Sequence, residues 1–145
     1  MIALIQRVAR AQVSVEGRSV ASTGPGILAL IGIEASDSLE SGQALLERLL
    51  HYRIFSDEAG KMNLDIIQIG GELMLVPQFT LVADTRKGTR PGFSKGAPPN
   101  EARELFTRVV ELAAALHPKV ASGVFGADMQ VELVNDGPVT FWLQS

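Results

Sequence analysis

Two short segments hold the residue types that could carry out chemistry. Val76 to Leu81 reads Val-Pro-Gln-Phe-Thr-Leu, so an amide and a hydroxyl stand two residues apart. Asn135 to Thr140 reads Asn-Asp-Gly-Pro-Val-Thr and lies between two apolar runs, 129–134 and 139–143. Glycine tolerates unusual backbone angles and proline fixes its own, so a Gly-Pro pair can aim main-chain carbonyl groups rigidly into a site. A plain hairpin turn is the alternative interpretation of the second segment.

Gln78 and Thr80 suggest two kinds of ester chemistry. In a strand, Gln78 and Thr80 would share one face and Phe79 would point to the other. Gln78 and the adjacent backbone N–H groups could then stabilise an oxyanion. Thr80 could instead be a nucleophile, but its hydroxyl needs a base, and no candidate base lies near it in sequence. Threonine is also simply a common strand residue.

Other catalytic parts are scarce. The two histidines, His51 and His117, fall near the ends of the two predicted helices, where histidine usually caps the helix or interacts with its dipole. Neither has a metal-ligand residue three or four positions later. There is no cysteine and no Gly-rich phosphate loop. We therefore expect no metal and no cofactor.

Composition points to a single domain spanning residues 1–145. Apolar residues make up 46% of the 145, and the formal net charge of −3 gives no global attraction to nucleic acid. No apolar run approaches the ~20 residues of a membrane helix. Met1 leads directly into a strand-like pattern with no basic leader, so a soluble, cytoplasmic protein is expected.

Hydrophobic periodicity predicts more strands than helices. The predicted helices run from Ser38 to about Tyr52, with Asp37 and Glu40 as a capping box, and from Asn100 to His117. Residues 57–64 are expected to be a loop, and the predicted strands are 2–8, 12–20 with a turn at 16–17, 27–33, 53–56, 72–82, 120–124, 129–134 and 139–143. The expected fold is α/β, with a β-rich, barrel-like or two-sheet core and two main helices packed on it.

The long connection from Ala83 to Pro99 is basic. It has no acidic residue after Asp84, and it carries four cations: Arg86, Lys87, Arg90 and Lys95. A loop of this length inside a compact domain is usually functional or disordered. It could be a local phosphate-binding patch suited to the end of an RNA, or only a solvated surface loop.

The two motifs together resemble the signatures of the D-aminoacyl-tRNA deacylases, which usually read Ser-Gln-Phe-Thr-Leu and Asn-x-Gly-Pro-Val-Thr. Four further segments are similar to family segments and follow the family's order: 3–8, 60–64, 83–88 and 125–131. The resemblance therefore covers essentially the whole chain. It implies the DTD-like fold and hydrolysis of the ester between a D-amino acid and tRNA, with water attacking the carbonyl and the ribose 2′-hydroxyl able to assist.

The resemblance also implies residue roles. Gly137 and Pro138 would form a cis peptide that enters the active site of the partner subunit of a homodimer. Their carbonyl groups would leave no room for an L side chain, while D residues and glycine would pass. Arg7 would brace this motif, and Met129 would lie near the pocket. The aminoacyl-tRNA 3′ end would be the partner.

One position departs from the family pattern, because Pro77 stands where serine is usual. A sister group with relaxed chirality also tends to carry proline there, yet Phe79 and the intact second motif favour the D-specific group. Two other hypotheses stay open. One is a non-catalytic nucleic-acid-binding protein that uses the basic loop; the other is a covalent hydrolase that uses Thr80.

Overall fold

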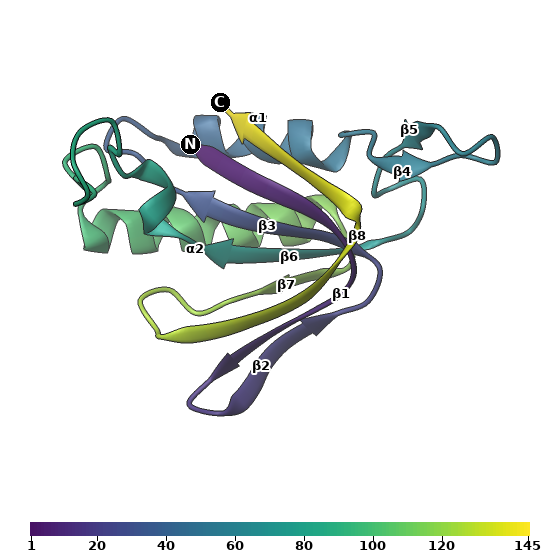
Figure 1. Ribbon diagram of the computed structural model, residues 1–145, viewed down its shortest axis with the longest axis horizontal. Helices are drawn as coiled ribbons and strands as arrows, with labels where there is room; N and C mark the ends of the chain where they lie inside the picture. The colour runs from purple at the N-terminus through teal and green to yellow at the C-terminus, as the bar shows by residue number, and fades with distance from the viewer.

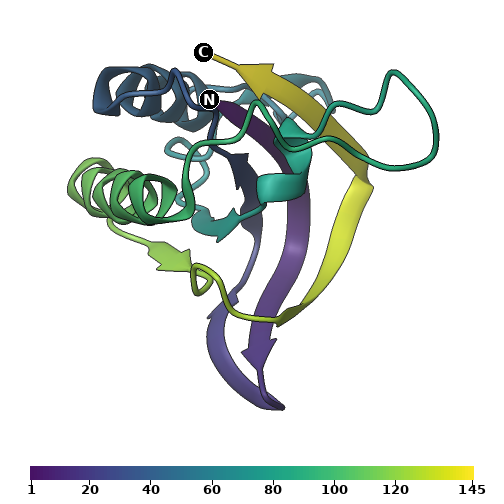
Figure 2. The ribbon, with the colours of Figure 1, turned by 90° about the vertical axis from the view of Figure 1, so that its left-hand side faces the viewer.

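The computed structural model describes residues 1–145 and is built around one long strand. β1 (Ile2–Val15) pairs with β3 (Gly26–Gly32) through its first half and with β2 (Arg18–Thr23) through its second half. β8 (Met129–Gln144) pairs antiparallel with β1 along its other edge. The sheet continues from β3 in parallel through β6 (Glu72–Pro77) to β7 (Val120–Ser122). Figure 2 shows the strong curvature that makes this sheet barrel-like, as the sequence predicted.

The two helices cover one side of the sheet (Figures 1 and 2). These are α1 (Leu39–Leu50) and α2 (Pro99–Leu116), and a small sheet of β4 (Phe55–Ser56) and β5 (Met62–Leu64) extends beyond them. The apolar stripes of both helices belong to the larger core cluster, which includes Leu46, Leu49 and Phe106. Burying each such side chain contributes about 1.5–3 kcal/mol. No helix in the structure is both long and apolar enough to span a membrane.

The strand predicted over residues 72–82 ends early. β6 stops at Pro77, and a 3-10 helix, η1 (Phe79–Val82), follows. β3 ends at Gly32, where an added Cβ would lie 3.0 Å from the Cβ of Leu81. This close approach turns the chain inward and buries Val82, while Phe79 and Thr80 stay exposed.

The two terminal strands predicted from the sequence are halves of one. Both halves of β8 pair with β1, so the segment between them is not a hairpin turn. The strands predicted at 2–8 and 12–20 are not separated as predicted. β1 runs unbroken from Ile2 to Val15, the turn at Glu16 and Gly17 follows, and β2 then begins at Arg18. The loop predicted at 57–64 includes β5.

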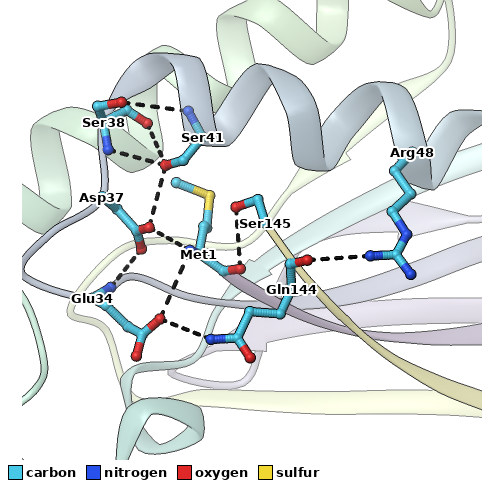
Figure 3. A network of polar contacts seen from close by, with 8 residues as sticks. All are labelled: Met1, Glu34, Asp37, Ser38, Ser41, Arg48, Gln144 and Ser145. Carbon is cyan, nitrogen blue, oxygen red and sulfur yellow. Dashed lines mark hydrogen bonds and ion pairs between the residues drawn. The ribbon is translucent and has the colours of Figure 1, made fainter.

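The predicted capping box uses other residues. Ser38 caps α1, and its side chain and that of Ser41 exchange hydrogen bonds with each other's backbone N–H groups. Asp37 instead accepts from the Glu34 N–H at 2.7 Å and from the Met1 ammonium group, as Figure 3 shows. The ammonium group is a stronger partner for the carboxylate than a helix N–H, so serine is left to cap the helix.

Candidate active site

A cleft of about 720 Å³ opens beyond the end of β6. One wall is the segment from Phe93 to Pro99, the other runs from Phe125 to Val131, and Pro77 to Phe79 lie between them. Ile31, Ile33, Val76, Val82 and Ala102 complete the lining, and no side chain that lines the cleft is titratable. The cleft therefore offers shape, apolar surface and backbone groups rather than a charged acid or base.

Gln78 and Thr80 lie together, although not by strand alternation. The Gln78 side-chain amide donates a hydrogen bond to the Thr80 hydroxyl. Gln78 lines the cleft, whereas Thr80 does not, so Thr80 contacts the cleft through Gln78. The Gln78 backbone N–H donates to the Ile31 carbonyl at 2.7 Å. The Gln78 N–H is therefore not free to bind an oxyanion. The N–H groups of Phe79 and Thr80 are free, because the first N–H groups of a helix have no acceptor within it.

Pro77 fits its position because the neighbouring strand has ended. The Gln78 N–H bonds to β3, so the nitrogen of residue 77 faces the other edge of β6. β7 pairs with β6 only as far as Leu75. A proline at residue 77 therefore removes no hydrogen bond of the sheet, unlike a proline in a central ladder.

Two exposed aromatic rings stand at the mouth of the cleft. Phe79 is 65% exposed and Phe93 is 43% exposed, and their ring centroids lie 5.2 Å apart. Large apolar side chains left in solvent at a cleft usually mark a binding surface. Phe93 lies within the basic loop, 14 residues after Phe79, and no spacing in the sequence indicated this pair.

Met129 lies on the opposite wall of the cleft. Its sulfur accepts a hydrogen bond from the Val124 N–H at 3.3 Å. An added Cβ at Gly123 would lie 2.9 Å from that sulfur, so the wall is closely packed there. Met129 is half-buried and lines the cleft rather than lying wholly in the core.

The second motif forms a bulge in β8. Gln6 pairs with Thr140 and Val8 pairs with Asn135, so residues 136–139 stand opposite Arg7 alone. The Asn135 amide closes the base of this bulge: its oxygen accepts from the Val139 N–H at 2.8 Å, and its nitrogen donates to the Thr140 hydroxyl at 2.9 Å.

Gly137 and Pro138 form the exposed tip of the bulge. The peptide bond between them is cis, as the resemblance to the deacylases implied. Arg7 holds the bulge from below, because its Nε donates to the Asp136 carbonyl at 2.8 Å and its Nη1 donates to the Ile54 carbonyl at 2.6 Å. The Arg7 side chain is only 14% exposed.

The bulge and the cleft of one chain lie far apart. Ile31 pairs with both Ala3 and Pro77, whereas the bulge stands opposite Arg7, four residues further along β1. Four strand residues span ~13 Å, and β1 and β3 lie between the bulge and β6. No residue of 135–140 lines the cleft. Figure 1 shows the bend of β8 at the end of the sheet away from the arrowhead of β6.

The basic loop is closed at its base. Asp84 and Gly92 exchange two backbone hydrogen bonds, at 2.7 and 3.0 Å. Arg86 pairs with the Asp84 carboxylate through two side-chain nitrogens, with Nε 2.9 Å from Oδ1. This pair holds the pKa of Asp84 far below its usual value. The charge of Arg86 is therefore largely neutralised within the loop, while Lys87, Arg90 and Lys95 are exposed and unpaired.

Neither histidine reaches the cleft. The exposed His51 ring lies 3.2 Å from the Asp65 carboxylate at the end of α1. Burial alone would raise the pKa of Asp65, but hydrogen bonds from Gln68 and His51 hold it below its usual value. His117 is buried and contacts the Gly71 carbonyl at 2.9 Å. No group of three potential metal ligands occurs in the structure.

The chain is similar to known proteins along essentially its whole length. The family model described as D-Tyr-tRNA(Tyr) deacylase matches residues 4–144. D-aminoacyl-tRNA deacylase of Azotobacter vinelandii is 59% identical over 145 residues, which is 100% of both chains. The protein of the same name from Thioalkalivibrio sulfidiphilus is 58% identical and covers 99% of this chain and 97% of its own.

Two solved structures share the fold. One is described as the c-Myc DNA unwinding element binding protein; it is 35% identical, has a TM-score of 0.95, and covers 100% of this chain and 99% of its own. The other is described as a probable eukaryotic D-amino acid tRNA deacylase. It is 16% identical with a TM-score of 0.88 and covers 99% of this chain and 98% of its own.

Proposed function

The chain belongs to the D-Tyr-tRNA(Tyr) deacylase family, and we propose that its cleft hydrolyses the ester between a D-amino acid and tRNA while L-aminoacyl-tRNA is rejected. It is thus a hydrolase of the aminoacyl-tRNA ester bond. The finer steps concern how the ester is hydrolysed and how chirality is selected.

Hydrolysis proceeds by positioning rather than by a charged base. An aminoacyl ester is already activated, so orientation and a few preorganised donors are enough to accelerate attack by water. Gln78 and the free N–H groups of Phe79 and Thr80 face the carbonyl oxygen, and the ribose 2′-hydroxyl assists the water. Support comes from the absence of any titratable side chain among the residues that line the cleft.

Chirality is read by the Gly137-Pro138 tip of a second subunit. The observation that carries this proposal is the separation of the bulge from the cleft within one chain, because the tip can meet a cleft only if another copy supplies it. Main-chain carbonyl groups beside the substrate α-carbon exclude an L side chain and ignore the identity of a D side chain. Glycine has no side chain to exclude and is also a substrate.

An open strand edge supports the homodimer. β8 pairs only with β1, so its outer edge is unpaired along the strand. Val134 and Trp142 on β8 are 39% and 50% exposed. A long edge strand with exposed apolar side chains is a liability in a monomer, and a second copy would cover it.

Complementation between two defective chains tests the cross-subunit step. Gln78→Ala impairs the cleft and Gly137→Ala impairs the tip, and each homodimer should be defective. A co-purified heterodimer has one site that combines an intact cleft with an intact tip from the other chain. About half of the wild-type D-tyrosyl-tRNA deacylation should return, with L-tyrosyl-tRNA spared. A heterodimer as defective as both homodimers would contradict the cross-subunit arrangement.

The basic loop binds the tRNA acceptor end through Lys87, Arg90 and Lys95, with Arg86 shaping the loop. The reaction is placed in the cytoplasm, where aminoacyl-tRNA serves translation.

A second candidate function is nucleic-acid binding without catalysis, which the description of one solved relative as a DNA-unwinding-element binding protein favours. Tight binding of duplex DNA together with no deacylation of any aminoacyl-tRNA would select that alternative.

A further inference from the structure

The guanidinium group of Arg103 lies against the wall of the cleft opposite the basic loop. Arg103 is near the start of α2, and its Cζ is 5.1 Å from the centroid of the Phe125 ring. Its Nη1 donates a hydrogen bond to the Phe125 carbonyl at 3.1 Å. Phe125 and Gly126 both line the cleft. One arginine therefore contacts both the ring and the backbone of this wall.

Gly126 allows the guanidinium to come this close. Its φ is +78°, and an added Cβ would lie 3.0 Å from Arg103 Nη2. The contact with the Phe125 ring, the hydrogen bond to the Phe125 carbonyl and the close approach to Gly126 together fix the plane of the guanidinium group. A cation ordered in this way loses little conformational freedom when it binds a ligand.

The charge of Arg103 is not used within the chain. Arg103 is exposed and forms no ion pair, whereas Arg86 is paired with Asp84 and Arg7 is held under the bulge. A guanidinium has five N–H donors, and only one hydrogen bond from those of Arg103 goes to a protein acceptor. Arg108, five residues further along α2, instead lines an acidic groove with Glu34, Asp37, Glu101 and Glu104.

We propose that Arg103 binds a phosphate group of the tRNA 3′ end at the rim of the cleft, across from Phe93 and Lys95. The inference rests on the proposed function, because it assigns the substrate strand a second cationic contact. A strand whose terminal aminoacyl ester enters the cleft must lead its phosphates out over the rim. Single strands are held by cations that track phosphates beside aromatic surfaces, and planar guanidinium groups match phosphate geometry. Arg103 is a substrate-binding residue with no part in bond cleavage.

The test compares Arg103→Gln with Arg108→Gln, which makes the same charge change on the same helix. Dissociation constants for uncharged tRNA and KM and kcat for D-tyrosyl-tRNA are measured from 50 to 300 mM salt. Arg103→Gln should raise KM by about 5- to 20-fold with little change in kcat. It should also reduce the slope of log K against log salt by ~0.7, the value for one single-strand phosphate contact. Arg108→Gln should leave both quantities at the wild-type level.

Arg103→Lys separates charge from geometry, because it should keep the salt slope while KM rises by a smaller factor. A wild-type KM and salt slope in Arg103→Gln would overturn the inference, and so would an equal loss in Arg108→Gln, which would indicate only general electrostatics. Absence of deacylation by the wild-type protein would instead contradict the proposed function, and the uncharged-tRNA binding curves would still decide the role of Arg103. Equal melting temperatures would show that both variants remain folded.

Discussion

Arg7 and Asp136 are joined across the ladder between β1 and β8. The Arg7 Nε donates a hydrogen bond to the Asp136 carbonyl at 2.8 Å and lies 3.6 Å from the Asp136 carboxylate. Because the same guanidinium also donates to the Ile54 carbonyl at 2.6 Å, it ties the bulge to the start of the small sheet. The residue immediately before Gly137 is thus fixed by a side chain from the opening strand.

Arg7→Lys tests this brace. A lysine ammonium cannot reproduce the fork that serves two carbonyl groups, so the bulge should lose its fixed position. We expect at least a ~10-fold fall in the ratio of D- to L-tyrosyl-tRNA deacylation, since hydrogen bonds from charged groups contribute about 1.5–3 kcal/mol. Arg10→Lys, an exposed arginine on the same strand, is the control. An unchanged ratio in Arg7→Lys would show that the brace is dispensable.

Gly137→Ala should disturb the tip of the bulge. Gly137 has a φ of +149°, and an added Cβ would lie 2.6 Å from Val139 Cγ2 and 2.8 Å from the Val139 nitrogen. The loop must shift to accommodate it, so D-tyrosyl-tRNA deacylation or its preference over the L substrate should fall by at least ~10-fold. Gly17→Ala, in an exposed turn with open space around it, is the matched glycine control. Wild-type kinetics in Gly137→Ala would contradict the role of the tip.

Thr80→Ala distinguishes positioning from covalent catalysis. Thr80 accepts a hydrogen bond from Gln78 and does not line the cleft, so its loss should lower kcat by only about 10- to 100-fold. Thr80→Ser keeps the hydroxyl and should restore most of the activity. A fall of at least ~10⁴-fold in a folded variant, together with a trapped acyl-enzyme in the wild type, would support a threonine nucleophile.

The basic loop should contain two kinds of cation. Lys87→Gln with Arg90→Gln should flatten the salt dependence of tRNA binding by ~1.4, or ~0.7 for each single-strand phosphate contact. Arg86→Gln should change the slope little, because Asp84 already neutralises this charge. Since the pKa of Asp84 is lowered in the folded state, the clamp is fully present above ~pH 4 and is lost only as pH falls through the lowered value. If the salt dependence of tRNA binding were the same in every variant as in the wild type, the loop would be only a solvated surface.

His51→Gln should leave kcat/KM within about twofold of wild type. The His51–Asp65 contact is the one histidine–carboxylate pair in the structure and so is the obvious alternative general base. It lies at the end of α1, and neither residue lines the cleft. The pH profile of kcat/KM from pH 5.5 to 8.5 should coincide with that of the wild type. A loss above ~10-fold or the loss of an inflection would make His51 part of the mechanism.

Local patterns predicted the element types well, and tertiary contacts explain the errors. Residues 72–82 were predicted as one long strand, yet the packing of Leu81 and Val82 against Gly32 turns the chain after Pro77. Residues 136–138 were interpreted as a possible hairpin turn, because no local pattern shows that β1 is long enough to pair with both flanking runs.

The site was only partly visible in the sequence. The proximity of Gln78 and Thr80 was predicted for the wrong reason, since a 3-10 turn and a hydrogen bond bring them together. Phe93 and Arg103 were missed because each contacts an aromatic ring distant in sequence, Phe79 and Phe125 respectively. Nor does the basic composition of the loop reveal that Arg86 is neutralised, which depends on the closed geometry at Asp84.

The most direct test of the account is deacylation of matched D- and L-tyrosyl-tRNA by the purified protein under identical conditions. Spontaneous ester hydrolysis without protein is subtracted for each substrate. We expect rapid loss of the D ester and an L ester that decays no faster than the protein-free control. Equal catalysed rates on both substrates would contradict chiral selection by the Gly137-Pro138 tip, and no catalysis on either would contradict the deacylase function itself.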